Sequence, residues 1–247
     1  MKDLANFNRD GYAIVRGLVS REDCARMLDV ATSHLARAIA PLEYEADVRY
    51  PGSPDSHDAP GGRTVRRLLQ AYARDPLFAR WATSPAVADH LHALLGPAVE
   101  LSQAHHNCVM TKDPRYGSLT SWHRDIRYWS FERPELVSTW LALGRERVEN
   151  GCLLVLPGSH AIDLGPDRLD EAQFLRTDVE ANAPLIAAQA PVELEPGDVL
   201  FFHSRLFHAA GRNRTGQTKY SVVFTYHAAD NRPLPGSRSA SLPDIAL

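Results

Sequence analysis

The sequence predicts a mainly β protein with flanking α-helices, built on a double-stranded β-helix (jelly-roll) core with N-terminal helices packed on one sheet. Two observations support this prediction. Helical patterns are concentrated at about residues 20–96, and from about residue 97 to 230 the chain changes to many short strands separated by turn residues. Helices followed by many short strands are typical of a sandwich or barrel with added helices.

Composition is consistent with one domain spanning residues 1–247, because 44% of the residues are hydrophobic and barrels with added helices reach this size. A formal net charge of −3 gives no reason to expect a nucleic-acid partner. The cysteines are odd in number and scattered, which favours a reducing compartment over a disulfide framework. We find no signal segment and no apolar run of spanning length. We therefore expect a cytoplasmic protein; its oligomeric state stays open.

The N-terminal elements carry clear boundary signals. Ser20 begins a capping-box pattern ahead of a helix predicted over residues 21–39. Residues 41–62 are rich in Pro, Gly, Ser and Asp and predict a long loop, of the kind that is either a lid or disordered. A second helical region covers residues 76–95, and Pro85 divides it in two.

Strands dominate the rest of the chain. Asn150-Gly151 is the strongest hairpin signal, and residues 160–186 predict a loop with a short helix. Strands are expected over residues 11–19, 99–112, 119–126, 135–143, 152–156, 191–195, 198–203 and 219–227.

A pair of histidines and an aspartate have the composition of a metal site. His123 and Asp125 are two residues apart in an expected strand, so their side chains would share one face. His208 follows a later strand. Two imidazoles and one carboxylate can occupy one face of an octahedral metal and leave three positions open, which is typical of non-haem Fe(II) oxygenases. His203 follows the same strand as His208 and is the alternative distal ligand.

The expected strand over residues 219–227 alternates between two kinds of side chain. Tyr220, Val222, Phe224 and Tyr226 form an apolar face, whereas the other face is mostly polar. A polar face among aromatic neighbours suggests a wet cavity. There Lys219 supplies a cation and Ser221 a hydroxyl, a pair suited to hold the distal carboxylate of 2-oxoglutarate.

Over most of its length the chain resembles the phytanoyl-CoA dioxygenase family of Fe(II)/2-oxoglutarate oxygenases. The resemblance implies a cupin-like core, Fe(II), 2-oxoglutarate and O2 as cofactors, and His123, Asp125 and His208 as iron ligands. It also implies hydroxylation, because halogenases of this superfamily replace the carboxylate ligand with a small residue. The matching segments are Phe7 to Gly17, His123-Arg124-Asp125, Tyr128-Trp129, Trp140, Asn150 to His160 and Gly197 to Gly211.

The resemblance also implies the co-substrate residues. Trp140 would form a wall of the 2-oxoglutarate pocket, and Arg67 is a basic residue expected to reach toward the site. Lys219 stands where the family usually has Arg, and Ala210 where it often has Ser or Thr. Lys is a point charge and lacks the bidentate fork of Arg, so the geometry at the distal carboxylate is expected to differ.

The main substrate is expected to be anionic, because arginines cluster near the metal motif. On a continuous strand Arg127 would share the face of His123 and Asp125. An ion pair from Arg127 to Glu132 or Glu135 is the structural alternative. The further substrate-binding candidates are Arg115, Tyr128 and His105, the last chosen because on a continuous strand it would share the polar face of Gln103 and Asn107.

The run from Thr120 to Trp129 resembles the branch that hydroxylates 3-deoxy-D-manno-octulosonic acid (Kdo), the sugar acid of lipopolysaccharide. A glycolipid substrate of this kind would add peripheral contact with the inner membrane. Two alternatives remain at this point: a hydroxylase of an acyl-CoA or other small acidic metabolite, and a non-catalytic cupin-like protein that binds a metal or sugar.

Overall fold

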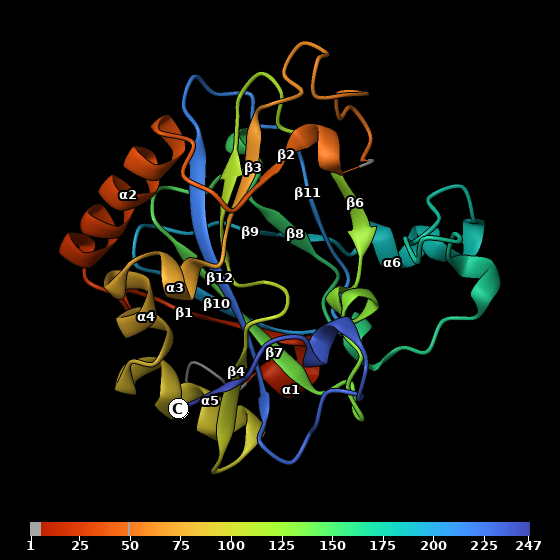
Figure 1. Cartoon of the computed structure of the whole chain (residues 1–247). Coiled ribbons are helices and arrows are strands. Elements are labelled where there is room, and N and C mark those ends of the chain that lie inside the picture. The colour runs from red at the N-terminus through yellow and green to blue at the C-terminus, as the bar shows by residue number, and fades with distance from the viewer. Residues whose placement is uncertain (1–5, 49) are drawn as a thin grey trace.

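Two antiparallel β-sheets form the framework of the computed structural model, which describes residues 6–48 and 50–247. The large sheet has the order β1-β10-β7-β12-β5-β3-β2, with β4 paired to β12 and β13 paired to β4; the small sheet has the order β6-β11-β8-β9. This arrangement confirms the predicted jelly-roll class (Figure 1). The strands of the large sheet are β1 (Tyr12–Val15), β2 (Leu42–Tyr44), β3 (Val65–Leu69), β4 (Val99–Ser102), β5 (Cys108–Lys112), β7 (Leu136–Ala142), β10 (Val199–His203), β12 (Lys219–Ala228) and β13 (Ile245–Ala246). Those of the small sheet are β6 (Thr120–His123), β8 (Leu153–Val155), β9 (Ala190–Val192) and β11 (His208–Ala210).

Helices α2, α4 and α5 begin where the sequence signals place them. The Ser20 hydroxyl accepts a hydrogen bond from the backbone N–H of Asp23 at 3.0 Å, and Pro85 opens a separate helix. In Figure 1 the helices α2, α4 and α5 lie along one side of the large sheet. The α-helices are α1 (Phe7–Asp10), α2 (Arg21–Ala36), α3 (Ala71–Arg74), α4 (Pro76–Ala82), α5 (Pro85–Leu95) and α6 (Ala183–Ala187).

Strand β12 divides the hydrophobic core into two parts. Its residues Val222, Phe224 and Tyr226 pack in one cluster with residues of α2, α4 and α5. Val223, on the opposite face, belongs to a second cluster between the two sheets, together with Trp140. Burial of the apolar face under the helices leaves the other face of the strand to line a cavity, as its alternation predicted.

The expected strand over residues 99–112 is two strands, β4 and β5, separated at residues 103–107. Both pair with the same strand: β4 lies against Thr225–Ala228 and β5 against Lys219–Val223 of β12. The chain leaves the sheet between them, where the Asn107 side chain accepts a hydrogen bond from the backbone N–H of Tyr72. This break changes which of the neighbouring histidines faces the site.

Two other local predictions are wrong. Gly151 has the left-handed conformation expected of a turn (φ 73°), but β7 and β8 lie in different sheets, so Asn150-Gly151 is a crossover between sheets and not a hairpin. Residues 20–96 were expected to contain helices and a loop, but β2 and β3 also lie there and extend the large sheet.

Within the described part of the chain, every helix is too short or too polar to cross a membrane.

Candidate active site

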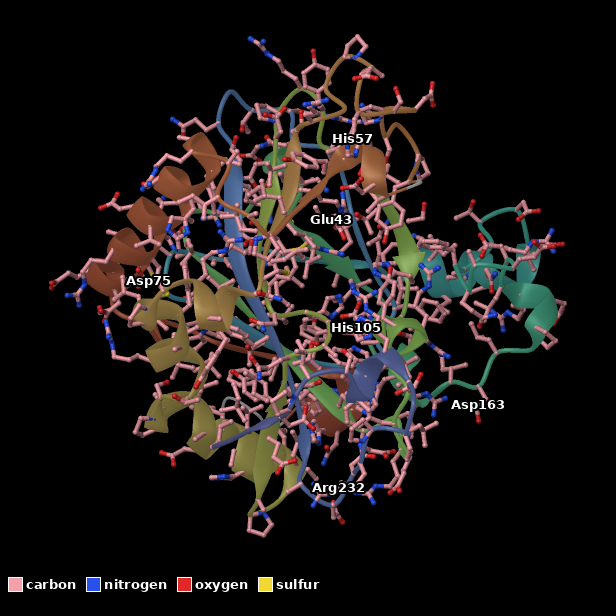
Figure 2. All side chains as sticks on the ribbon, viewed as in Figure 1. Glu43, His57, Asp75, His105, Asp163 and Arg232 are labelled. Carbon is pink, nitrogen blue, oxygen red and sulfur yellow. The ribbon has the colours of Figure 1, made fainter. Side chains whose placement is uncertain are left out.

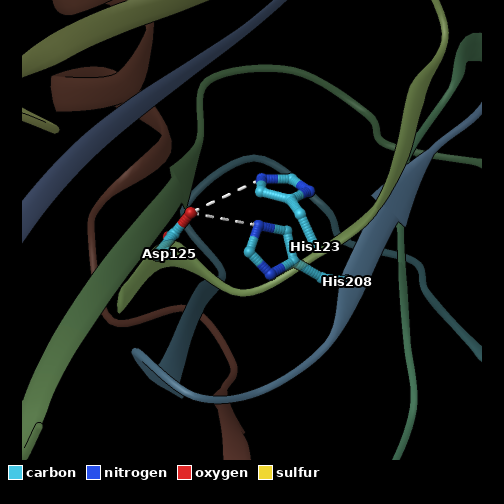
Figure 3. Close-up of side chains that lie close together, drawn as sticks. All are labelled: His123, Asp125 and His208. Atoms are coloured by element: carbon cyan, nitrogen blue, oxygen red, sulfur yellow. Dashed lines mark ion pairs between the residues drawn. The ribbon is translucent and has the colours of Figure 1, made fainter. Parts of the chain in front are cut away.

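The small sheet and the turn that follows β6 bring His123, Asp125 and His208 together (Figure 3). His123 ends β6 and His208 begins β11, and the two are direct cross-strand partners. Asp125 does not continue the strand as predicted, because it begins a 3-10 helix over Asp125–Tyr128. Its Oδ1 lies 3.6 Å from His123 Nε2 and 3.4 Å from His208 Nε2. All three side chains are buried.

The donor atoms of this cluster fit a metal ion. The Nδ1 of His123 lies 2.9 Å from the Ser121 carbonyl oxygen, and the Nδ1 of His208 lies 3.1 Å from the Leu206 carbonyl oxygen. Each Nδ1 therefore carries the proton and donates it, which leaves each Nε2 with a lone pair. Two lone pairs and a carboxylate oxygen that face one another need a cation between them, and this donor set suits Fe(II).

His106 completes the surroundings of the carboxylate and was missed from the sequence. Its Nδ1 lies 3.3 Å from Asp125 Oδ2. Burial alone would raise the pKa of the Asp125 carboxyl, but the imidazoles of His106 and His208 hold that pKa well below its usual range. The site therefore keeps a charged carboxylate ready for a metal. The argument that chose His105 assumed a continuous strand, and the break at residues 103–107 removes that assumption.

His203, the alternative distal ligand, lies apart from this cluster. Its Nδ1 accepts a hydrogen bond from the backbone N–H of Arg205 at 3.0 Å, and its ring faces that of His160. The Nδ1 lone pair of His203 is therefore already bound by the backbone, away from the three candidate ligands.

The three residues expected around the 2-oxoglutarate carboxylate converge on a buried side chain, Glu146. Lys219 Nζ lies 2.9 Å from Glu146 Oε2. The Ser221 hydroxyl and the Trp140 indole N–H donate to Glu146 Oε1 at 2.6 and 2.9 Å. Glu146 is fully buried, so the cluster is a closed ion pair with every carboxylate oxygen satisfied. Glu146 is one of 30 acidic residues, and its position before the Asn150-Gly151 turn gave no signal of this role.

A second buried cation, Lys112, lies directly across the sheet from Lys219. No ion pair to Lys112 occurs among the described residues. Burial, helped by the charge of Lys219, lowers the pKa of Lys112 to about 7. One cavity is lined by both lysines and by the candidate iron ligands, so an anion bound there would meet Lys112 as well as Lys219.

Comparisons with known proteins decide the family. The sequence pattern of the phytanoyl-CoA dioxygenase family matches residues 7–221. The chain belongs to the phytanoyl-CoA dioxygenase family. It is accordingly an Fe(II)- and 2-oxoglutarate-dependent dioxygenase that uses O2, as the sequence resemblance implied.

The individual relatives are distant in sequence, but each match covers most of both chains. It is 27% identical over 231 residues to the probable phytanoyl-CoA dioxygenase of Caenorhabditis elegans, covering 89% of this chain and 72% of that protein. It is 28% identical over 247 residues to the ectoine dioxygenase of Sphingopyxis alaskensis, covering 94% and 76%. Among solved structures it resembles the epimerase SnoN in complex with Fe3+, alpha-ketoglutarate and nogalamycin RO, with a TM-score of 0.74, 25% identity and coverage of 99% and 93%.

A second cavity, of about 320 Å³, adjoins the first. Tyr50, Arg67 and His106 line both cavities. Arg67 forms an ion pair with Glu43 at 3.0 Å, so it is a charge-balanced wall between them. His105 also lines the second cavity and packs edge to face on Trp129; it is half-buried.

Of the remaining predicted substrate residues, only Tyr128 lines a cavity, whereas Arg127 and Arg115 line neither. Tyr128 lines the second cavity, and its hydroxyl hydrogen-bonds that of Tyr50 at 2.8 Å. The Arg127 guanidinium carbon lies 4.2 Å from the centre of the Phe174 ring, and the described residues include no ion pair between Arg127 and a carboxylate. Arg115 is exposed and lines neither cavity, so the structure does not bring it to the site.

Proposed function

We propose that this dioxygenase hydroxylates an unactivated C–H bond of an anionic substrate held in the second cavity. The supporting observation is the shared wall of Tyr50, Arg67 and His106, which sets a bound molecule beside the iron ligands. When bound, Fe(II) with 2-oxoglutarate and O2 supplies the oxidising chemistry that converts C–H to C–OH. The protein's own share is binding, orientation and exclusion of water.

In this proposal His123, Asp125 and His208 hold the iron. Lys219 and Lys112 attract the distal carboxylate of 2-oxoglutarate, and Ser221 and Trp140 shape the end of its pocket. Burial of these side chains strengthens the attraction, because screening by water is weak there.

The second cavity has a mixture of groups suited to a polar anion. Arg238 lines it, and no carboxylate is paired with Arg238 in the described residues. Burial lowers the pKa of His105 to about 3, so at neutral pH His105 is an uncharged hydrogen-bonding group. A substrate with both a carboxylate and hydroxyls would use both kinds of group.

Kdo has this chemistry and remains our specific proposal for the substrate, on a lipopolysaccharide or lipid A carrier. A fatty acyl-CoA or another small acidic metabolite is the second candidate, favoured by the relatives that are named for phytanoyl-CoA and ectoine. Family membership overturns the non-catalytic cupin-like alternative. The three buried free cysteines support a reducing, cytoplasmic location, with contact at the inner membrane if the substrate is a lipid.

The test is a screen with the iron-loaded enzyme. Kdo-containing lipid A, free Kdo, neutral sugars and acyl-CoAs are each offered with 2-oxoglutarate, and succinate release is followed by mass spectrometry for a product heavier by one oxygen. We expect coupled turnover with an anionic substrate. Coupling to neutral substrates alone would contradict the proposal, and coupling to acyl-CoA without Kdo would replace the specific substrate.

Arg127→Ala is expected to weaken binding of the main substrate by about tenfold, because Arg127 is a half-buried cation with no carboxylate partner among the described residues, and pairing with an anion would be favourable there. Iron and 2-oxoglutarate affinity should stay near wild type, and uncoupled succinate release should become a larger share of turnover. Arg238→Ala is expected to have the same signature with a smaller effect, because Arg238 lines the second cavity but is exposed to solvent. Arg115→Ala, which changes an exposed arginine outside both cavities, is the matched control. An Arg127→Ala enzyme with unchanged substrate KM would assign Arg127 to packing on Phe174.

A further inference from the structure

A second cluster of possible metal ligands lies outside the active site, where three adjacent strands meet. His227 on β12 is the direct cross-strand partner of Glu100 on β4. Asp244 immediately precedes β13, which pairs with β4 on its other side. The three side chains offer one nitrogen and two carboxylate oxygens within 4.8 Å of one another. His227 is fully buried, and the two acids are only slightly exposed.

The hydrogen bonds of His227 leave its other ring nitrogen without a partner. Its Nδ1 lies 2.9 Å from the Ala228 carbonyl oxygen and donates to it, so the neutral ring carries a lone pair on Nε2. That Nε2 is buried, forms no hydrogen bond within the described residues, and lies 3.3 Å from Asp244 Oδ2. The Asp244 Oδ1 is likewise buried without a partner. Unpaired acceptors facing one another are costly unless a cation lies between them.

We propose that His227, Glu100 and Asp244 form a second metal site, for a divalent ion of the Zn2+ type. A buried imidazole whose Nδ1–H is fixed by a backbone carbonyl is the usual form of a metal-bound histidine. One imidazole and two carboxylates suit Zn2+, with water as the fourth ligand. Arg232 lies 3.6 Å from Glu100, but its side chain is 62% exposed and lies at the periphery in Figure 2, so it can turn away into solvent when the ion binds.

A metal here would anchor one wall of the second cavity. The segment between β12 and β13 contains Arg238 and Leu242, which line that cavity. Two contacts fix the C-terminal end of this segment. Asp244 lies 3.3 Å from His227, and the Gln103 side chain donates a hydrogen bond of 2.7 Å to the Pro243 carbonyl. The ion would therefore tie the end of this segment to β4 and β12. Binding of the ion does not depend on the proposed substrate, so the two proposals can fail separately.

The experiment measures Zn2+ in a chain whose iron site has been removed. In the His123→Ala/His208→Ala variant we expect one Zn2+ per chain by elemental analysis and calorimetric titration, and a higher Tm when Zn2+ is added. Asp244→Asn in this background should weaken Zn2+ binding by at least about 100-fold, since groups that merely orient a ligand already contribute about 10–100-fold. Glu100→Gln, at a less buried position, provides a second variant if Asp244→Asn folds poorly.

The matched control is Asp230→Asn in the same background, because Asp230 is an exposed carboxylate 78% accessible to solvent and paired with Arg133. It should leave Zn2+ binding unchanged. Absence of stoichiometric Zn2+ binding, or binding that survives both Asp244→Asn and Glu100→Gln, would overturn the proposal. If no Zn2+ binds, His227 and Asp244 form an ordinary ion pair in which the imidazole is protonated.

Discussion

His123→Ala, Asp125→Ala and His208→Ala are each expected to abolish 2-oxoglutarate turnover and to lower the iron content of the purified protein strongly. Within the described residues, these three side chains are the ones whose donor atoms face one another at this point, whereas the nearby His106 contacts only the other oxygen of Asp125. We therefore expect no neighbour to replace a lost ligand fully. In each histidine Nδ1 donates to a backbone carbonyl, so Nε2 is the nitrogen available to a metal. Iron per chain and succinate release are the two measurements, and the Tm of the metal-free protein reports whether each variant folds.

His203→Ala is the control for this series, because His203 ends β10 of the large sheet and its ring accepts a hydrogen bond from the backbone N–H of Arg205. It should retain most of the iron. Loss of iron in His203→Ala, with retention in His208→Ala, would show that the distal ligand has been assigned to the wrong histidine.

Lys219→Ala is expected to raise the KM for 2-oxoglutarate by at least about 30-fold, and far more than the KM for the main substrate. Loss of a buried charge partner costs about 2–5 kcal/mol, and about 1.4 kcal/mol corresponds to a factor of ten. The variant also leaves the Glu146 carboxylate buried and unpaired beside the pocket, which adds repulsion toward the co-substrate and destabilises the fold.

A double variant separates these two effects. Lys219→Ala/Glu146→Gln removes the unpaired charge but keeps an acceptor for Trp140 and Ser221, so it should recover the Tm of the metal-free protein. The raised KM for 2-oxoglutarate should persist, because the cation is still missing. Full recovery of KM in the double variant would mean that Lys219 only neutralises Glu146 and that Lys112 alone binds the co-substrate. An unchanged KM in Lys219→Ala would move the role to Arg67, Arg212 or Arg214.

Features encoded by neighbouring residues were predictable from the sequence. The start of α2 follows from the Ser20 cap, and the separation of α4 from α5 follows from Pro85. The two faces of β12 follow from strict alternation, since each residue of a strand points opposite to the next. That His123, Asp125 and His208 lie together could be expected because this set of residue types is the one that suits a single metal ion.

Features that depend on pairing between distant segments were not predictable. The break between β4 and β5 is visible only in the pairing with β12, where residues 103–107 lie opposite the single residue Phe224, and nothing in residues 103–107 alone predicts it. That break decides that His106 lies beside Asp125, while His105 lines the neighbouring cavity. Glu146 is similarly ordinary in sequence, and its importance comes from Lys219, 73 positions away along the chain.

The contact between Tyr50 and Phe174, whose ring centres lie 5.8 Å apart, has a consequence for how this enzyme can acquire new substrates. Tyr50 belongs to the connection between β2 and β3, and Phe174 to the long connection between β8 and β9 that extends away from the sheets in Figure 1. The candidate iron ligands lie on or directly beside strands, whereas these two connections meet at Tyr50, which lines both cavities. The connection from β8 to β9 is also bridged to the end of β6 at His123 and Phe174, so a change at Phe174 itself would reach the candidate ligand. Changes in the parts of the two connections away from this bridge can alter selectivity in evolution while the oxidative chemistry is inherited unchanged.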